Sequence, residues 1–182
     1  MLMIILASAS PRRKEILQTA GIEFEVRVAE VEEKITPGQS PEETVKDLAR
    51  QKALAVAKAN PQTTVIGADT IVVLEGEILG KPRDWADAIK MLKSLSGKTH
   101  SVFTGVCLVK DGEENRFFEE TKVEFYNLSN EEIEAYVDTG EPMDKAGAYG
   151  IQGKGCLLVK RIEGDYFNVV GLPVGKLVRE LM

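Results

Sequence analysis

Hydrophobic residues in the N-terminal part of the chain follow two kinds of spacing. Met3–Ala7 is a continuous apolar run, which is typical of a buried strand. Pro11–Ala20 opens with a proline and places its apolar residues at helical spacing, which predicts a helix. A second strand is expected where apolar residues alternate at Phe24, Val26 and Val28.

The middle of the chain continues this alternation of helices and strands. Ser40–Glu43 combines a capping serine, a proline and two acidic residues, so we expect a helix from there to about Ala59. Thr64–Leu74 is rich in β-branched residues, which predicts a core strand that Gly67–Thr70 interrupts. Glu75-Gly76 then predicts a hairpin-type turn.

The C-terminal half places long strand-like runs between capped helices. Helices are expected after the capping residues Asp84 and Ser129, and from Pro173 onward. Such an alternation of helices and long strands predicts an α/β fold with a mixed sheet. The strand-like runs are His100–Val109, Arg116–Leu128, Leu157–Ile162 and Tyr166–Val170.

Composition restricts the classes of function. The chain has 182 residues and a net charge of −6, which suits one domain, with or without an appendage, and lacks the basic surface that non-specific nucleic-acid binding requires. No apolar run is long enough to span a membrane. The apolar segment Met1–Leu6 has no basic leader, so we expect a buried strand there and not a signal peptide.

The cysteines and the histidine exclude several kinds of site. Cys107 and Cys156 form neither a disulfide framework nor a zinc motif, which favours a reducing compartment and a cytoplasmic protein. His100 is the only histidine, so histidine-rich metal sites are excluded, and a structural role for it is favoured over a general base. Nucleotide-binding glycine motifs and the serine-hydrolase elbow are absent from the sequence.

The segment Ser8–Arg13 has the features of an anion site. It follows the first predicted strand, and Pro11 stands at the expected helix start, where unpaired N–H groups and the helix dipole favour a phosphate. Arg12 and Arg13 add forked donors that match phosphate oxygens. The alternative is a capped helix with solvated arginines.

Asp69 stands out as a carboxylate inside an apolar, strand-like run. Burying a carboxylate is costly unless it is paired, hydrogen-bonded or bound to a metal, and ionisable groups in such places tend to mark functional sites. We therefore favour a functional role for Asp69. The alternative is an aspartate that caps a strand bend or pairs with a lysine.

Other charged residues could complete a site around that aspartate. Lys81 ends the next short strand and Lys52 lies on a predicted helix beside small apolar residues, although each of them taken alone is more often a surface lysine. Glu32 and Glu33 could help to hold a divalent cation, because Mg²⁺ accepts carboxylate, water and phosphate oxygens, or could belong to a solvated loop.

A glycine-rich stretch covers Thr139–Gly155. Its part Asp144–Gly153 combines glycines, which allow close approach, with Gln152, whose amide can both donate and accept hydrogen bonds at the edge of a pyrimidine. The stretch could therefore wrap a planar base, and the alternative is a flexible connector.

These segments, in their order along the chain, resemble one protein family over nearly the whole length. The chain is similar to the Maf proteins, a family of nucleoside triphosphate pyrophosphatases. Each segment is weak alone, and their combination makes the resemblance specific. The segments that carry it are Ser8–Arg13, Gly67–Thr70, Gly80–Pro82, Ser96–His100, Asp144–Gly153, Gly164–Tyr166 and Gly171–Pro173.

The resemblance implies a fold, a reaction and a set of site residues. The fold would be a single α/β domain over residues 1–182, with a mixed, curved central sheet flanked by helices and two lobes around a cleft, as in the inosine triphosphate pyrophosphatases. The reaction would convert a nucleotide to its monophosphate and pyrophosphate with a divalent metal cation, Mg²⁺ or Mn²⁺. Asp69 matches the proposed general base, and Glu33 and Asp69 match metal ligands. The residues that match the phosphate environment are Ser8, Arg12, Arg13, Lys52 and Lys81.

Three positions distinguish the branches of the family. This chain has Arg12, Thr70 and Gln152 and so resembles the branch that acts on dTTP and UTP, whereas the 7-methyl-GTP branch has Trp, Gln and Glu there. The expected substrates are dTTP and UTP, with modified pyrimidine nucleotides as further candidates for a house-cleaning role.

A second class of function stays open at this point. A nucleotide-binding regulator of cell division would need the same cationic residues but not Asp69. For either class we expect a nucleoside triphosphate as the partner, with no nucleic acid and no membrane. The sequence leaves open whether the protein forms a homodimer.

Overall fold

The structure is a computed structural model that describes residues 3–182, so Met1 and Leu2 of the first expected strand lie outside the described residues. The chain forms two compact units, each of which is discontinuous in sequence. Unit 1 comprises residues 3–70, Thr104–Glu119 and Gly171–Met182. Unit 2 comprises Ile71–Phe103 and Glu120–Val170.

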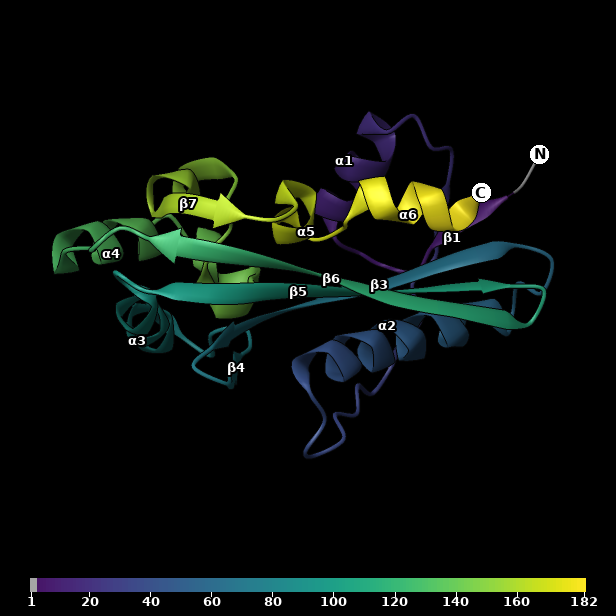
Figure 1. The fold of residues 1–182 in the computed structure, drawn as a ribbon, viewed down its shortest axis with the longest axis horizontal. Helices are drawn as coiled ribbons and strands as arrows, with labels where there is room; N and C mark the ends of the chain where they lie inside the picture. Colours follow the sequence, from purple (N-terminus) through teal and green to yellow (C-terminus); the bar gives the residue numbers. More distant parts are fainter. Residues whose placement is uncertain (1–2) are drawn as a thin grey trace. The chain divides into compact units, whose positions relative to one another are not determined.

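The described residues contain one seven-stranded sheet with the order β2-β1-β3-β5-β6-β7, and β4 pairs with β3 (Figure 1). β1 pairs in parallel with both β2 and β3, whereas β3–β4 and β6–β7 are antiparallel. The sheet is therefore mixed, as predicted. Its strands are β1 (Ile4–Leu6), β2 (Glu25–Val26), β3 (Thr64–Leu74), β4 (Glu77–Leu79), β5 (Thr99–Lys110), β6 (Glu113–Phe125) and β7 (Val159–Glu163).

The helices begin where the sequence places capping residues. The side chains of Ser40, Asp84 and Ser129 each accept a hydrogen bond from a backbone N–H of the first helical turn, as predicted. No helix among residues 3–182 has the length and apolar character needed to cross a membrane. The helices are α1 (Pro11–Thr19), α2 (Pro41–Ala57), α3 (Trp85–Leu95), α4 (Asn130–Val137), α5 (Tyr166–Val170) and α6 (Val174–Leu181), with 3₁₀ turns η1 (Glu141–Asp144), η2 (Ala146–Ala148) and η3 (Gly153–Leu157).

In unit 1, α2 covers one face of the strands, and α1 and α6 cover the other (Figure 1). Two glycines let α2 approach closely. A Cβ on Gly67 would lie 2.3 Å from the Ala49 carbonyl oxygen, and one on Gly105 would lie 2.3 Å from that of Val45. Any side chain at these positions of β3 and β5 would push the helix away.

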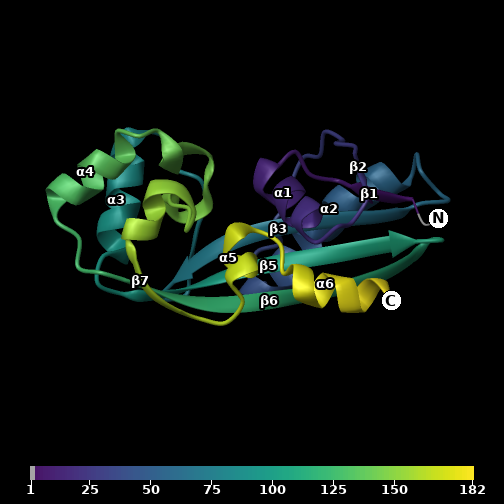
Figure 2. The same ribbon diagram turned by 90° about the horizontal axis from the view of Figure 1, so that it is seen from above.

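Unit 2 has its own core, formed by α3, α4 and the glycine-rich stretch against the strands (Figure 2). Leu92 and Leu95 of α3 meet Ile133 of α4, and all three are almost completely buried. Tyr136 and Tyr149 complete this core with buried aromatic rings. The glycine-rich stretch is therefore packed on one side, in contrast to the flexible connector that was the alternative.

Two sequence-based expectations about elements were wrong. β3 is continuous over Thr64–Leu74, and Gly67–Thr70 does not interrupt it. Gly67 is a strand residue without a side chain because α2 packs directly against it. Tyr166–Val170 is the helix α5 and not a strand. The buried Asn168 side chain donates hydrogen bonds to Val102 O and Thr121 Oγ1, and such tertiary contacts override the strand preference of its aromatic and β-branched neighbours. The expected second strand is present as β2, although it comprises only the two exposed residues Glu25 and Val26.

Candidate functional site

The predicted anion segment lies at the carboxyl end of β1, where the strand order of unit 1 changes direction. From β1 the chain passes through α1 to β2 on one side, while β3 lies on the other side. Ligands of α/β proteins tend to bind at such switch points. Ser10 caps α1 through a hydrogen bond from Arg13 N (3.4 Å), and Pro11 occupies the first helical position. The predicted strand–loop–helix geometry is confirmed.

Asp69 is paired with Lys52, which brings two predicted site residues together. Asp69 follows Gly67 by two residues and so faces the same side of β3 as the glycine that admits α2. Lys52 of α2 forms an ion pair with Asp69 Oδ1, and its Nζ also lies 3.1 Å from Glu33 Oε1. The alternative that Asp69 pairs with a lysine therefore describes its contact correctly, and that lysine is itself a candidate site residue.

Glu33 is held near Lys52 by the segment that precedes α2. Gln51 accepts a hydrogen bond from Lys34 N (2.9 Å) and donates one to Lys34 O (2.7 Å), which ties this segment to α2. The Glu33 side chain is 47% exposed, compared with 14% for Asp69. The cluster of Asp69, Lys52 and Glu33 is thus accessible to solvent at Glu33.

Arg13 is a buried hub and not a solvated arginine. Its guanidinium donates to Gly171 O (2.7 Å), Ser8 Oγ (3.2 Å) and Thr70 Oγ1 (3.0 Å). Burial lowers the pKa of Arg13, while the negative charge of Asp69 acts in the opposite direction. The guanidinium thus joins three distant segments of the chain. Arg12, its neighbour on α1, is half-buried.

Two residues of this hub were not given a role by sequence reasoning. Thr104 is fully buried in β5, and its hydroxyl shares a 2.8 Å hydrogen bond with that of Thr70. Gly171 contributes only a backbone carbonyl oxygen. A hydroxyl inside the apolar run of β5 is a detectable signal, but a backbone carbonyl leaves no signal in a sequence.

Lys81 and Gln152 belong to unit 2, and the structure brings their two segments together. Gly147 N donates a 3.0 Å hydrogen bond to Gly80 O, directly before Lys81. Lys81 and Gln152 are both exposed. That they join the Asp69 cluster around one substrate stays a prediction.

His100 has the structural environment that we expected for it. It is 2% exposed, and its Nε2 lies 2.7 Å from the Tyr149 hydroxyl oxygen. Burial lowers the pKa of His100 to about 4, so the imidazole is neutral near pH 7.

The carboxylates of the cluster suit a hard cation. No group of three or more His, Cys, Asp or Glu side chains arranged to hold a metal ion occurs among residues 3–182. Asp69 and Glu33 nevertheless contact the same ammonium group. Mg²⁺ is commonly held by one or two carboxylates together with water and substrate phosphates. This donor set therefore fits a cation that binds together with a phosphate ligand.

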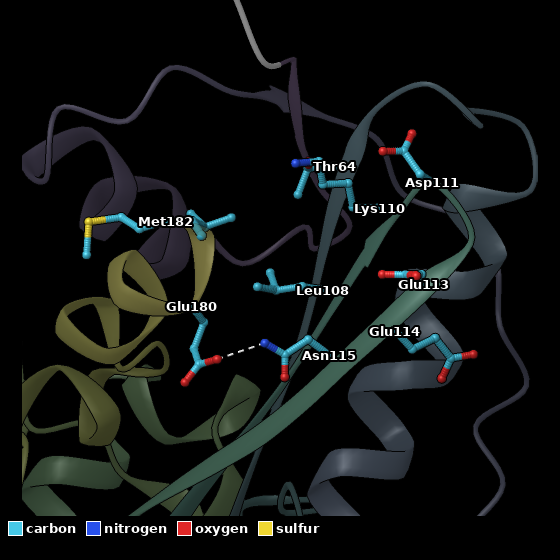
Figure 3. Close-up of a pocket in the computed structure, with 10 residues that line it drawn as sticks. Thr64, Leu108, Lys110, Asp111, Glu113, Glu114, Asn115, Glu180 and Met182 are labelled. Carbon is cyan, nitrogen blue, oxygen red and sulfur yellow. Dashed lines mark hydrogen bonds between the residues drawn. The ribbon is translucent and has the colours of Figure 1, made fainter.

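A pocket of about 380 Å³ lies elsewhere in unit 1 and involves none of the predicted site residues (Figure 3). The β5–β6 turn and the end of α6 form it. Four of its lining side chains are carboxylates, which disfavours a triphosphate. They are Asp111, Glu113, Glu114 and Glu180.

Comparison with known proteins places the chain among close relatives. Residues 3–182 match the family described as "Maf-like protein". Proteins named "dTTP/UTP pyrophosphatase" from Bacillus cereus and Bacillus anthracis are each 57% identical to it over 178 residues, which cover 98% of this chain and 93% of theirs.

Solved structures show the same fold at low sequence identity. A HAM1 protein from Coxiella burnetii has a TM-score of 0.57 and 19% identity, with 100% of this chain and 98% of that chain covered. The Ham1 protein of Staphylococcus aureus has a TM-score of 0.50 and 21% identity over 68% of this chain and 71% of that chain. The predicted α/β fold with a mixed sheet flanked by helices is confirmed.

Proposed function

This chain belongs to the Maf-like protein family, and we propose that it is a nucleoside triphosphate pyrophosphatase that hydrolyses dTTP and UTP to the monophosphate and pyrophosphate. The observation that carries the proposal is the cluster of Asp69, Lys52 and Glu33 in unit 1, which also holds the anion segment Ser8–Arg13. The names of the relatives favour catalysis over a purely regulatory nucleotide-binding protein.

The proposed mechanism begins with phosphate binding by cations inside an acidic protein. Arg12, Lys52 and Lys81 would offset the charge of the triphosphate, since phosphoryl-type transfer depends on positioning and charge stabilisation. Lys52 already binds carboxylates through its ammonium group, and phosphate oxygens can replace a carboxylate as its acceptor.

Ser8 would donate to the phosphate, and Arg13 would chiefly position the Ser8 hydroxyl. The Ser8 hydroxyl oxygen accepts hydrogen bonds from Arg13 Nη1 (3.2 Å) and Ser10 N (3.3 Å). A hydroxyl has one hydrogen to donate, and with its oxygen engaged as an acceptor that hydrogen can point to a phosphate oxygen. Three hydrogen bonds already engage the Arg13 guanidinium, which supports the view that it chiefly positions Ser8 and Thr70.

Asp69 would act as the general base. Its carboxylate would orient a water molecule and take its proton as the water oxygen attacks the α-phosphorus. The bond from the α-phosphorus to the bridging oxygen then breaks, and pyrophosphate leaves with that oxygen. Lys52 would hold the carboxylate in place through their ion pair.

We propose that Asp69 and Glu33 hold the divalent cation, Mg²⁺ or Mn²⁺. When bound, the cation would neutralise charge on the departing pyrophosphate. Both carboxylates contact the ammonium group of Lys52, so they lie close to each other. Oxygen atoms of both side chains would therefore be available to one cation.

Base selection is proposed to depend on Arg12, Thr70 and Gln152. Of these, Thr70 is held by Arg13 and Thr104, and Gln152 lies at the start of η3. We further propose that the two units act as one domain over residues 1–182, in the cytoplasm, on free canonical or modified pyrimidine nucleotides, without nucleic acid or membrane.

A substrate screen of the wild-type protein tests this function. Pyrophosphate release is measured for dTTP, UTP, GTP and modified pyrimidine triphosphates, with Mg²⁺ and with excess chelator. We expect release from dTTP and UTP that is fastest with Mg²⁺. Binding of nucleotides without pyrophosphate release from any of them would instead support the regulatory function.

A further inference from the structure

Tyr149 anchors the glycine-rich stretch of unit 2 from inside its core. The ring is 5% exposed, and its hydroxyl shares a 2.7 Å hydrogen bond with His100 Nε2. Phe125 packs edge-on against both partners, with ring centroids 4.7 Å from Tyr149 and 5.0 Å from His100. The polar contact is therefore enclosed by aromatic rings, where water cannot replace it.

Further contacts hold the backbone on both sides of Tyr149. Gly150 N donates to the Tyr136 hydroxyl oxygen (3.2 Å), and Lys154 N donates to Glu141 Oε1 (3.1 Å). A Cβ on Gly147 would lie 2.9 Å from Val72 Cγ2, so this residue packs directly on β3. Hydrogen bonds thus hold the backbone on the N-terminal and on the C-terminal side of Gln152.

The contacts around Tyr149 hold Ala148 in an unfavourable backbone conformation. Its φ of +60° lies in the left-handed region, which non-glycine residues rarely adopt. Such backbone persists only where its surroundings over-determine it, and it is common at ligand sites. Ala148 directly precedes Tyr149, so the buried tyrosine is well placed to impose this turn.

We propose that the hydrogen bond between His100 and Tyr149 positions Gln152 for selection of the nucleotide base. His100 and Tyr149 would be positioning residues, because neither is exposed enough to contact the base and Gln152 is. This inference rests on the proposed function, since it concerns the choice of substrate by that same site. The neutral state of His100 is compatible with this contact, because a neutral imidazole can accept a hydrogen bond from the tyrosine hydroxyl or donate one to it.

The test is Tyr149→Phe, which removes the hydroxyl and keeps the ring. We expect the ratio of kcat/KM for UTP to that for GTP to fall about three- to tenfold, which is the scale of the net contribution of one hydrogen bond. The change should lie mainly in KM for UTP, with kcat nearly unchanged. Tyr126→Phe, at an exposed tyrosine of unit 2, is the matched control and should leave the ratio unchanged.

A double variant distinguishes positioning from a general structural effect. If Tyr149 acts through Gln152, then Tyr149→Phe should change the UTP/GTP ratio by less than twofold when Gln152→Ala is already present. Tyr136→Phe, which removes the acceptor of Gly150 N, should lower the ratio in the same direction. Equal effects of Tyr149→Phe in both backgrounds would overturn the proposal, as would an unchanged ratio in the single variant.

Methyl triphosphate separates this proposal from the proposed function itself. It has no base, so its hydrolysis by Tyr149→Phe should match that by the wild type at a temperature where both proteins are fully folded. If the wild type hydrolyses no nucleotide at all, the proposed function fails. If the wild type is active and selective but Tyr149→Phe keeps its selectivity, only the positioning role fails.

Discussion

The charged cluster of unit 1 and the glycine-rich stretch of unit 2 are built on opposite physical principles. Around Asp69 and Lys52, half-buried charges contact one another and stay partly open to solvent. Around Tyr149 and His100, a neutral hydrogen bond is buried among aromatic rings. Opposite charges can exchange partners when a phosphate or cation arrives, whereas a recognition surface for a planar base needs a fixed shape. Substitutions in each region test this difference.

Asp69→Asn should produce the largest loss. The amide keeps the size of the side chain but cannot accept a proton, so we expect kcat to fall by about 10²- to 10⁴-fold. Nucleotide binding, measured by calorimetry, should persist. Asp138→Asn, at an exposed aspartate of unit 2, is the matched control. Pyrophosphate release near the wild-type rate in Asp69→Asn would remove this residue from catalysis.

Arg13→Lys should act mainly on stability. A lysine keeps the charge but cannot reproduce a fork that bonds Ser8, Thr70 and Gly171 at once, so we expect a loss of about 2–3 kcal/mol in the free energy of unfolding. Thermal unfolding measures it, with Arg12→Lys as the neighbouring control. An unchanged melting temperature with a raised KM would show that Arg13 binds phosphate directly and is not a hub.

The buried imidazole of unit 2 should make stability depend on pH. The pKa of His100 is about 4 in the folded protein, below its ordinary value of 6.5, so the unfolded chain binds the proton more readily. The stabilisation is therefore present above pH 6.5 and is lost as the pH falls toward 4, by up to about 3 kcal/mol. His100→Gln should have a flatter profile of melting temperature between these pH values. Parallel profiles for the two proteins would contradict this.

Gln152→Glu should have the smallest effect, confined to the choice of base. The substitution removes a donor and adds a negative charge, so we expect a several-fold fall in the UTP/GTP ratio of kcat/KM with the protein still fully folded. Steady-state kinetics with both nucleotides measure it, and Gln62→Glu, at an exposed glutamine of unit 1, is a control for the added charge. An unchanged ratio would count against Gln152 as a reader of the base.

Local signals in the sequence predicted much of the fold. The caps Ser40, Asp84 and Ser129, and the turn at Glu75, lie within a few residues of the structure that they determine. The strand preference of Tyr166–Val170 misled the prediction, because the buried Asn168 makes contacts to residues far away in the sequence. Local preference is a weak guide where tertiary contacts decide.

The family, the mixed α/β fold and the candidate residues Asp69, Lys52 and Arg13 can be predicted from the amino-acid sequence, since capping, hydrophobic periodicity and short motifs are local properties. The partners of these residues depend on tertiary packing. Lys52 meets Asp69 because Gly67 lets α2 approach β3, and the Arg13 guanidinium reaches a carbonyl oxygen 158 residues away. Contacts of this kind depend on how helices pack on strands, which no spacing along the chain records.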